Sequence, residues 1–181
     1  MMSTNVEIYS ELREFFLDYY SCIWLTYRTC LPSLPGTTET TDCGWGCMLR
    51  SCQMMVAETL ILLNLGRGEW LKSEVTSDEE YKNILALFAD DVDAPLGLHK
   101  LLQIAYKKYQ EPVGIWYSPC KALSLFRRTC KGLKLFWVND GILVKEEIRN
   151  VSCNFKAPLL LVICVRLGTT KINMVGFFLQ I

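Results

Sequence analysis

The segment with the clearest chemical potential is 41–50, TDCGWGCMLR, where Cys47 stands at the start of a long apolar stretch. A helix N-terminus carries exposed N–H groups and a partial positive charge, which stabilise a thiolate over a thiol. Gly44 and Gly46 allow the backbone to turn sharply and leave the sulfur accessible to a substrate carbonyl. The pattern therefore suggests a nucleophile, although a buried structural cysteine is the commoner fate of this residue type.

A cysteine hydrolase also needs a base and oxyanion donors. The only histidine is His99, near the start of a predicted helix, where a structural or surface role is favoured over catalysis. Cys43 and Cys52 flank Cys47; they are candidate partners for an oxidised Cys47, and simple packing is the favoured interpretation. Since no paired C-x-x-C sets occur, neither a metal nor a cofactor is expected.

Composition narrows the function classes. In 181 residues, 51% are hydrophobic and five are tryptophan, which predicts a packed globular core. The 19 basic and 19 acidic residues cancel, which removes the electrostatic argument for nucleic acid or an anionic membrane as the main partner. The first residues lack a signal-peptide pattern, and the odd count of nine cysteines leaves at least one unpaired. We expect a reduced, cytoplasmic protein without a membrane span.

Hydrophobic periodicity predicts helices first and strands later. The helices are expected from a capping box at Thr4–Glu7 to about Tyr27, over 46–65, from a second capping box at Ser77–Glu80, over 98–109, and from Ser118–Pro119. The loops are expected at 31–41 and 90–97. The strands are expected at 133–138 and 142–144, joined as a hairpin by the turn 139–141, and at 158–165 as a buried strand.

This order of elements predicts an α+β fold of the papain-like type. The cysteine lies on a helical half, and the sheet that carries the base in such folds has only begun where the sequence ends. We expect a single papain-like peptidase domain over 1–181, C-terminally truncated, with part of its sheet missing.

Several motifs point to one family. Segment 44–50, GWGCMLR, resembles the active-site signature of the autophagins, the autophagy-related cysteine endopeptidases. The supporting matches lie in the family's order at 24–28 (WLTYR), 65–67 with Trp70, 114–119 (GIWYSP), 146–149 (EEIR), 158–168 and 172–173. The resemblance implies that Cys47 is the nucleophile, that the Tyr27 hydroxyl assists the oxyanion site, and that Trp116 lies over the substrate channel. By pattern alone, Tyr27 and Trp116 fit packing positions equally well.

The resemblance also implies a substrate. Autophagins cut after a C-terminal glycine in ubiquitin-like modifiers of the GABARAP type, both to process the precursor and to release the modifier from phosphatidylethanolamine. A narrow channel under a tryptophan suits glycine, because a larger side chain would clash there.

The catalytic aspartate and histidine of the family lie in an Asp-Pro-His segment that this sequence does not contain. We therefore expect a chain that is inactive alone. The alternatives are a catalytically silent module that binds the modifier and a truncated product that does not fold stably.

Overall fold

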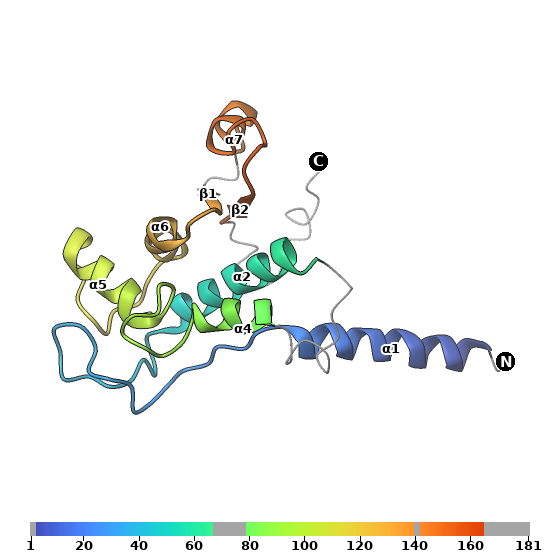
Figure 1. Cartoon of the computed structure of the whole chain (residues 1–181), viewed down its shortest axis with the longest axis horizontal. Coiled ribbons are helices and arrows are strands. Elements are labelled where there is room, and N and C mark those ends of the chain that lie inside the picture. Colours follow the sequence, from blue (N-terminus) through green and yellow to red (C-terminus); the bar gives the residue numbers. More distant parts are fainter. Residues whose placement is uncertain (1–2, 67–78, 140–141, 165–181) are drawn as a thin grey trace, which may run out of the picture. The chain divides into compact units, whose positions relative to one another are not determined.

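The structure, a computed structural model, describes residues 3–66, 79–139 and 142–164. Its elements along the chain are α1 (Ser3–Ser21), α2 (Cys47–Asn64), α4 (Glu79–Ala86), α5 (Leu98–Tyr109), α6 (Pro119–Thr129), β1 (Lys134–Val138), α7 (Lys145–Val151) and β2 (Leu159–Ile163) (Figure 1). The chain divides into two compact units, Met1–Tyr117 and Ser118–Ile181. The expected single domain stays a prediction. The described elements are mainly helices, with a small sheet late in the chain, as the sequence predicts.

Helix α2 is the central element of the first unit, and it follows the predicted bounds closely. Gly46 is its N-cap, and at its end the N–H of Leu65 donates to the Ile61 carbonyl at 2.8 Å. Gly66 then takes a φ of +80°, a left-handed conformation that suits glycine and stops the helix. Helix α4 packs beside α2 (Figure 1). The buried side chains of α2 are Leu49, Arg50, Cys52, Gln53, Val56, Ala57 and Ile61.

The first helix is shorter than its sequence pattern predicts. It ends at Ser21 instead of near Tyr27, and the chain continues in an extended conformation. In that segment Ile23 and Leu25 are buried while Trp24 is 56% exposed. Buried and exposed side chains alternate here at every residue, as they do in an extended chain. The apolar residues after Ser21 therefore follow a two-residue repeat rather than a helical one. The side chains of the Thr4–Glu7 capping box lie outside the described residues.

The remaining helices of the first unit complete its core. Helix α5 has the predicted bounds and buries one face, formed by Leu98, His99, Leu101, Leu102 and Ala105. A Cβ at Gly97, the N-cap of α5, would lie 2.7 Å from the Ala89 carbonyl oxygen, so this close approach of the two backbones requires glycine. Helix α4 begins at Glu79, and Ser77 of its predicted capping box lies outside the described residues.

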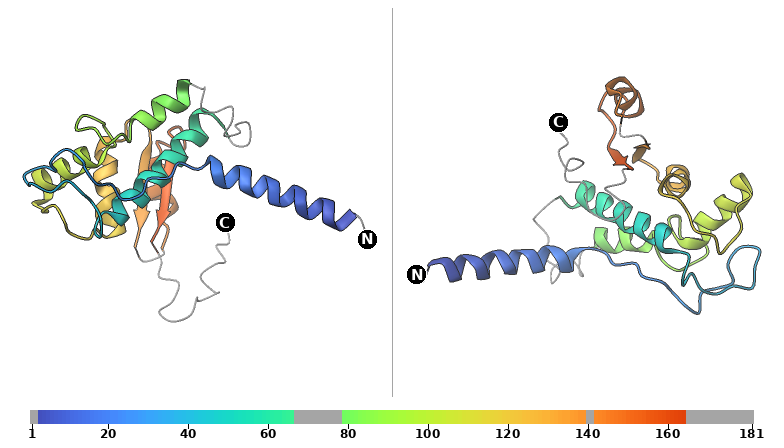
Figure 2. Two further views of the ribbon diagram at one scale, coloured as in Figure 1. Left: turned by 90° about the horizontal axis from the view of Figure 1, so that it is seen from below. Right: turned by 180° about the vertical axis from the view of Figure 1, so that it is seen from behind.

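The second unit contains a two-stranded parallel sheet. Strands β1 and β2 pair from Lys134↔Leu159 to Val138↔Ile163 (Figure 2). Helix α6 begins as predicted: the Ser118 hydroxyl accepts a hydrogen bond from the Lys121 N–H, and proline follows at the first helical position. Helices α6 and α7 both contact β1.

The strand predicted at 142–144 and its hairpin were wrong, whereas the strand predicted at 158–165 is confirmed as β2 and differs only in its burial. Residues 142–144 form no strand, because the described partner of β1 is β2, in parallel, and Val144 is already the N-cap of α7. The Asn139–Gly141 turn signal therefore does not close a hairpin; residues 140–141 lie outside the described residues. Strand β2 is half-buried along its length rather than buried.

Candidate active site

Cys47 is the first residue of α2, and its side chain is exposed. The preceding turn depends on two glycines. Gly44 has a φ of +83°, and a Cβ added at Gly46 would lie 2.7 Å from the Cβ of Asp42. The sequence therefore directs the chain through a turn that only glycines fit, and presents the sulfur at the helix N-terminus, where the first N–H groups have no helical partner.

Tyr27 lies beside Cys47. A hydrogen bond with the Cys47 side chain is the largest cause that raises the pKa of the Tyr27 phenol, and partial burial and the nearby Asp42 act in the same direction. A raised pKa keeps the phenol protonated at neutral pH, so that it remains a hydrogen-bond donor. Both residues border a shallow depression of about 250 Å³. The lining consists of Leu25, Thr26, Tyr27, Cys47, Arg50, Ser51 and Met54.

Trp116 is not a core residue: it is 77% exposed, whereas its neighbour Tyr117 is buried. Its indole Nε1–H donates a hydrogen bond to the Gly44 carbonyl oxygen at 2.8 Å. This bond anchors the indole to the glycine turn that precedes Cys47. Of the three residues that the sequence singled out, Cys47 directly follows this turn, Trp116 is hydrogen-bonded to it, and Tyr27 borders the same depression as Cys47.

A buried ion pair between Asp42 and Arg50 stabilises the turn before Cys47. The side chains of Asp42 and Arg50 are only 0% and 3% exposed, and Arg50 Nε donates to Asp42 Oδ2 at 2.8 Å. The other carboxylate oxygen of Asp42 accepts the backbone N–H of Arg28 at 2.7 Å. Asp42 therefore connects the start of α2, which carries Cys47, to the segment that carries Tyr27.

The ion pair extends into a network. Asp90 accepts from Arg50 at 3.2 Å and from Arg28 at 3.1 Å, and Gln53 links Arg50 to the Leu96 carbonyl. The sequence analysis missed this network. Arg50 is the residue that could have indicated the network, because it is a charged residue inside an apolar helix. A guanidinium that is buried there requires a carboxylate partner.

His99 is held away from this chemistry. It is 1% exposed, and its Nε2 lies 2.9 Å from the Pro32 carbonyl oxygen. A carbonyl oxygen can only accept, so Nε2 is the donor of this hydrogen bond. Nδ1 has no hydrogen-bond partner in the described part of the chain, and His99 is not among the residues that line the depression beside Cys47. The geometry supports a structural role.

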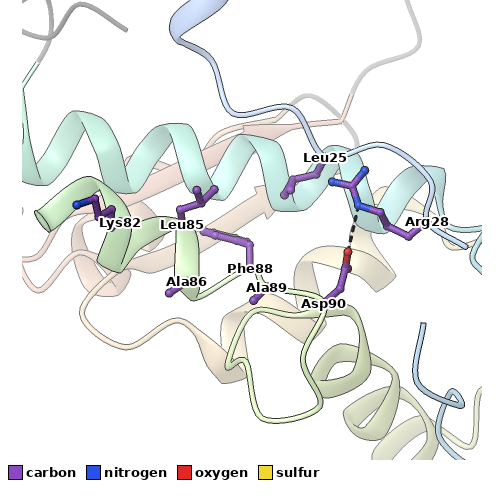
Figure 3. Close-up of a pocket in the computed structure, with 8 residues that line it drawn as sticks. All are labelled: Leu25, Arg28, Lys82, Leu85, Ala86, Phe88, Ala89 and Asp90. Carbon is purple, nitrogen blue, oxygen red and sulfur yellow. Dashed lines mark hydrogen bonds and ion pairs between the residues drawn. The ribbon is translucent and has the colours of Figure 1, made fainter. Parts of the chain in front are cut away.

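A larger, mainly apolar depression of about 390 Å³ is also lined by Leu25. Figure 3 shows the Arg28–Asp90 ion pair at its edge, with Phe88 and Leu85 farther in. The residues that line it include no cysteine, histidine or hydroxyl side chain. It therefore offers a surface for apolar contact and not a second reactive centre.

The candidate resolving cysteines differ in accessibility. Cys43 is exposed, with its sulfur 3.9 Å from the Arg28 carbonyl oxygen, whereas Cys52 is buried in α2. Among the described residues, no three His, Cys, Asp or Glu side chains gather as they would around a metal ion. Within the same residues, no helix is long and apolar enough to cross a membrane.

A helix-terminal cysteine with a phenol donor beside it is the arrangement of a thiol hydrolase, and the comparisons agree with this class. Residues 12–178 match the family model of the Peptidase C54 catalytic domain. The chain therefore belongs to the Peptidase C54 family, that of the Atg4 cysteine proteases of autophagy, which confirms the resemblance to the autophagins.

The relatives it resembles are longer proteins. It is 36% identical to Cysteine protease atg-4.2 of Caenorhabditis elegans, over 94% of this chain and 38% of that protein. It is 30% identical to Cysteine protease ATG4B of Gallus gallus, over 96% of this chain and 53% of that protein. The Probable cysteine protease ATG4 of Komagataella pastoris is 29% identical, over 90% of this chain and 36% of its own length. The chain thus spans about half, or less, of these relatives.

Proposed function

We propose that Cys47 is the nucleophile of a thiol endopeptidase site that acts after the C-terminal glycine of ubiquitin-like autophagy modifiers of the GABARAP type. The observation that carries the proposal is the position of Cys47 at the exposed N-terminus of α2, on the same depression as the Tyr27 side chain. A nucleophile and a hydrogen-bond donor that border one depression are two of the three parts that acyl transfer requires.

Each residue has a role in the proposed reaction. The sulfur of Cys47 attacks the carbonyl carbon of the substrate glycine, and the oxygen of that carbonyl becomes an oxyanion. The Tyr27 phenol donates a hydrogen bond to the oxyanion and remains protonated, as its raised pKa favours. Trp116, anchored to Gly44, covers the approach to the sulfur, where only a residue without a side chain fits.

The third requirement for acyl transfer is a general base, and we identify none for Cys47 in these 181 residues. Collapse of the tetrahedral adduct breaks the C–N bond, and the departing amine must receive a proton. The single histidine donates to a carbonyl inside the first unit and is not exposed. We propose that the chain alone does not turn over substrate: loss of the base from such a site costs on the order of a millionfold in kcat.

The site further suggests where and on what the chain acts. Five cysteines, Cys22, Cys30, Cys43, Cys47 and Cys153, are exposed free thiols, which supports a reduced, cytoplasmic compartment. The proposed partners are the modifier precursor and the modifier bound to phosphatidylethanolamine. One family model spans residues of both compact units, which supports a single catalytic domain as the functional body.

A silent binding module is the second candidate function, and the exposed Trp116 favours it. Trp116 offers a large contact surface for a modifier tail whether or not Cys47 reacts. Measured affinity for the modifier without turnover supports this candidate. An unstable product is the remaining alternative, and a cooperative thermal transition of the monomer contradicts it.

A modifier that carries an electrophilic vinyl ester on its terminal glycine tests the site without needing a leaving group. We expect a covalent adduct on Cys47, lost in Cys47→Ala and kept in the control Cys43→Ser. A modifier precursor in the same assay should remain uncleaved. An adduct that persists in Cys47→Ala contradicts the assignment of the nucleophile, and efficient cleavage of the precursor contradicts the inactivity.

A further inference from the structure

The second unit contains another pair of thiols, on two different elements. Cys120 is the second residue of α6, and Cys164 follows directly after the last residue of β2. Both are partly buried and both are free. The pair belongs to no part of the proposed protease site, which lies entirely in the first unit.

The sheet register brings the two cysteines together through Asn139. Val138 pairs with Ile163 at the end of the two strands, so that Asn139 and Cys164 are the next residues on either side. The Cys164 N–H donates to the Val138 carbonyl at 2.9 Å and extends the pairing by one bond. The Asn139 side-chain oxygen accepts a hydrogen bond from the sulfur of Cys120 at 2.6 Å.

The electrostatics at Cys164 agree with this placement. Burial is the largest cause that raises the pKa of the Cys164 thiol, and the charge of Cys120 and a side-chain hydrogen bond with Cys120 act in the same direction. Cys120 and Cys164 therefore meet at the same point: the Cys120 sulfur donates to Asn139, and the Cys164 backbone pairs with the residue before Asn139.

We propose that Cys120 and Cys164 are an oxidisable dithiol that forms an intramolecular disulfide with a low-molecular-weight disulfide such as oxidised glutathione. One cysteine thiolate attacks a glutathione sulfur and releases glutathione thiolate, which leaves a mixed disulfide on the protein. The second cysteine then attacks the protein sulfur of that mixed disulfide and expels the other glutathione. The two protein thiols lose two protons and two electrons, and oxidised glutathione accepts both electrons.

The other cysteines of this unit lack such a partner in the described structure. Burial raises the pKa of the Cys130 thiol to about 11, which disfavours the attacking thiolate. Cys153 is exposed in the turn after α7. The new bond would tie the first turn of α6 to the end of β2 and would replace the Cys120–Asn139 hydrogen bond.

Peptide mapping of the full chain tests the proposal. The folded chain is equilibrated with oxidised and reduced glutathione, alkylated and digested with trypsin without reduction. The expected product links peptide 109–121, which contains Cys120, to peptide 157–166, which contains Cys164, with a mass equal to their sum less two hydrogen atoms. The link should disappear in both Cys120→Ser and Cys164→Ser and remain in the control Cys153→Ser.

Two results overturn the proposal. One is a folded, oxidised wild-type chain in which both peptides are recovered alkylated or separately bound to glutathione. The other is a Cys120→Ser chain in which Cys164 joins another cysteine as readily as it joined Cys120, since this outcome shows that general exposure, and not the geometry at Asn139, selects the partner. Circular dichroism of the same samples verifies that the chain is folded during oxidation.

Discussion

Cys47 and Cys120 occupy nearly the same position, each in the first turn of a helix, and yet their surroundings differ. Cys47 is exposed and lies beside the phenol of Tyr27. Cys120 is half-buried and lies beside an amide oxygen and a second thiol. The neighbouring group therefore decides the chemistry: a donor for an oxyanion suits attack on a carbonyl, whereas a second thiol suits disulfide formation.

The two sites are also held in place differently. The turn before Cys47 rests on the buried Asp42–Arg50 ion pair, which is linked in turn to Asp90. The site of Cys120 rests on neutral hydrogen bonds at the end of a two-stranded sheet. Removing one member of a buried ion pair costs more than removing a neutral bond, so the first site should be the more sensitive to substitution of its support.

The largest effect on stability is expected for Asp42→Ala. This substitution leaves the 3%-exposed Arg50 with Asp90 as its only carboxylate and removes the acceptor of the Arg28 N–H. We expect a loss of about 3–5 kcal/mol in the free energy of unfolding, measured by urea denaturation. The exposed Asp93→Ala is the matched control and should change stability little. Equal losses in the two variants would contradict the role of the network.

A smaller effect is expected for Tyr27→Phe, which keeps the ring and removes the hydroxyl. With a modifier thioester in place of the vinyl ester, acylation of Cys47 should be about a hundredfold slower, because attack on the carbonyl forms an oxyanion and one of its donors is gone. Tyr106→Phe changes an exposed tyrosine of α5 and should react at the wild-type rate. An unchanged rate in Tyr27→Phe would reduce Tyr27 to a packing residue and remove the main difference between the two cysteine sites.

The smallest effect concerns pH. Since burial, and then Cys120, raise the pKa of the Cys164 thiol, the thiol form is favoured at neutral pH. Alkylation requires the thiolate, so the rate at Cys164 should rise with pH at a midpoint above that of N-acetylcysteine. Quantification of peptide 157–166 across a pH series measures this midpoint. In Cys120→Ser the midpoint should fall toward the reference, and a Cys164 midpoint at or below the reference would contradict the predicted contact.

The sequence predicted what depends on local signals. The glycine turn and the apolar repeat gave α2, and Ser118 followed by proline gave the start of α6. Prediction from the sequence failed where the structure depends on pairing with a segment that is distant in the sequence. The turn signal at Asn139 suggested a hairpin, but β1 pairs in the structure with β2, which lies beyond α7. A local turn preference cannot show which strand is the better partner.

The same distinction holds for the site. Cys47 could be found from its flanking glycines, and Tyr27 and Trp116 through the family resemblance, although their roles stay predictions. The support of the site was missed, because nothing local indicates that Asp42, Arg50 and Asp90 meet. The contact of Cys120 with Cys164 was missed for the same reason: it depends on a sheet register that spans a crossover.

We propose that Cys47 is a competent nucleophile in a chain that does not turn over substrate alone. The most direct measurement gives the purified chain both the vinyl-ester modifier and an intact modifier precursor, and follows both by intact-protein mass spectrometry. The account predicts a single adduct, mapped to Cys47 and absent in Cys47→Ala, with the precursor left uncut. No adduct on a folded chain, or an adduct on Cys120 instead, would contradict it.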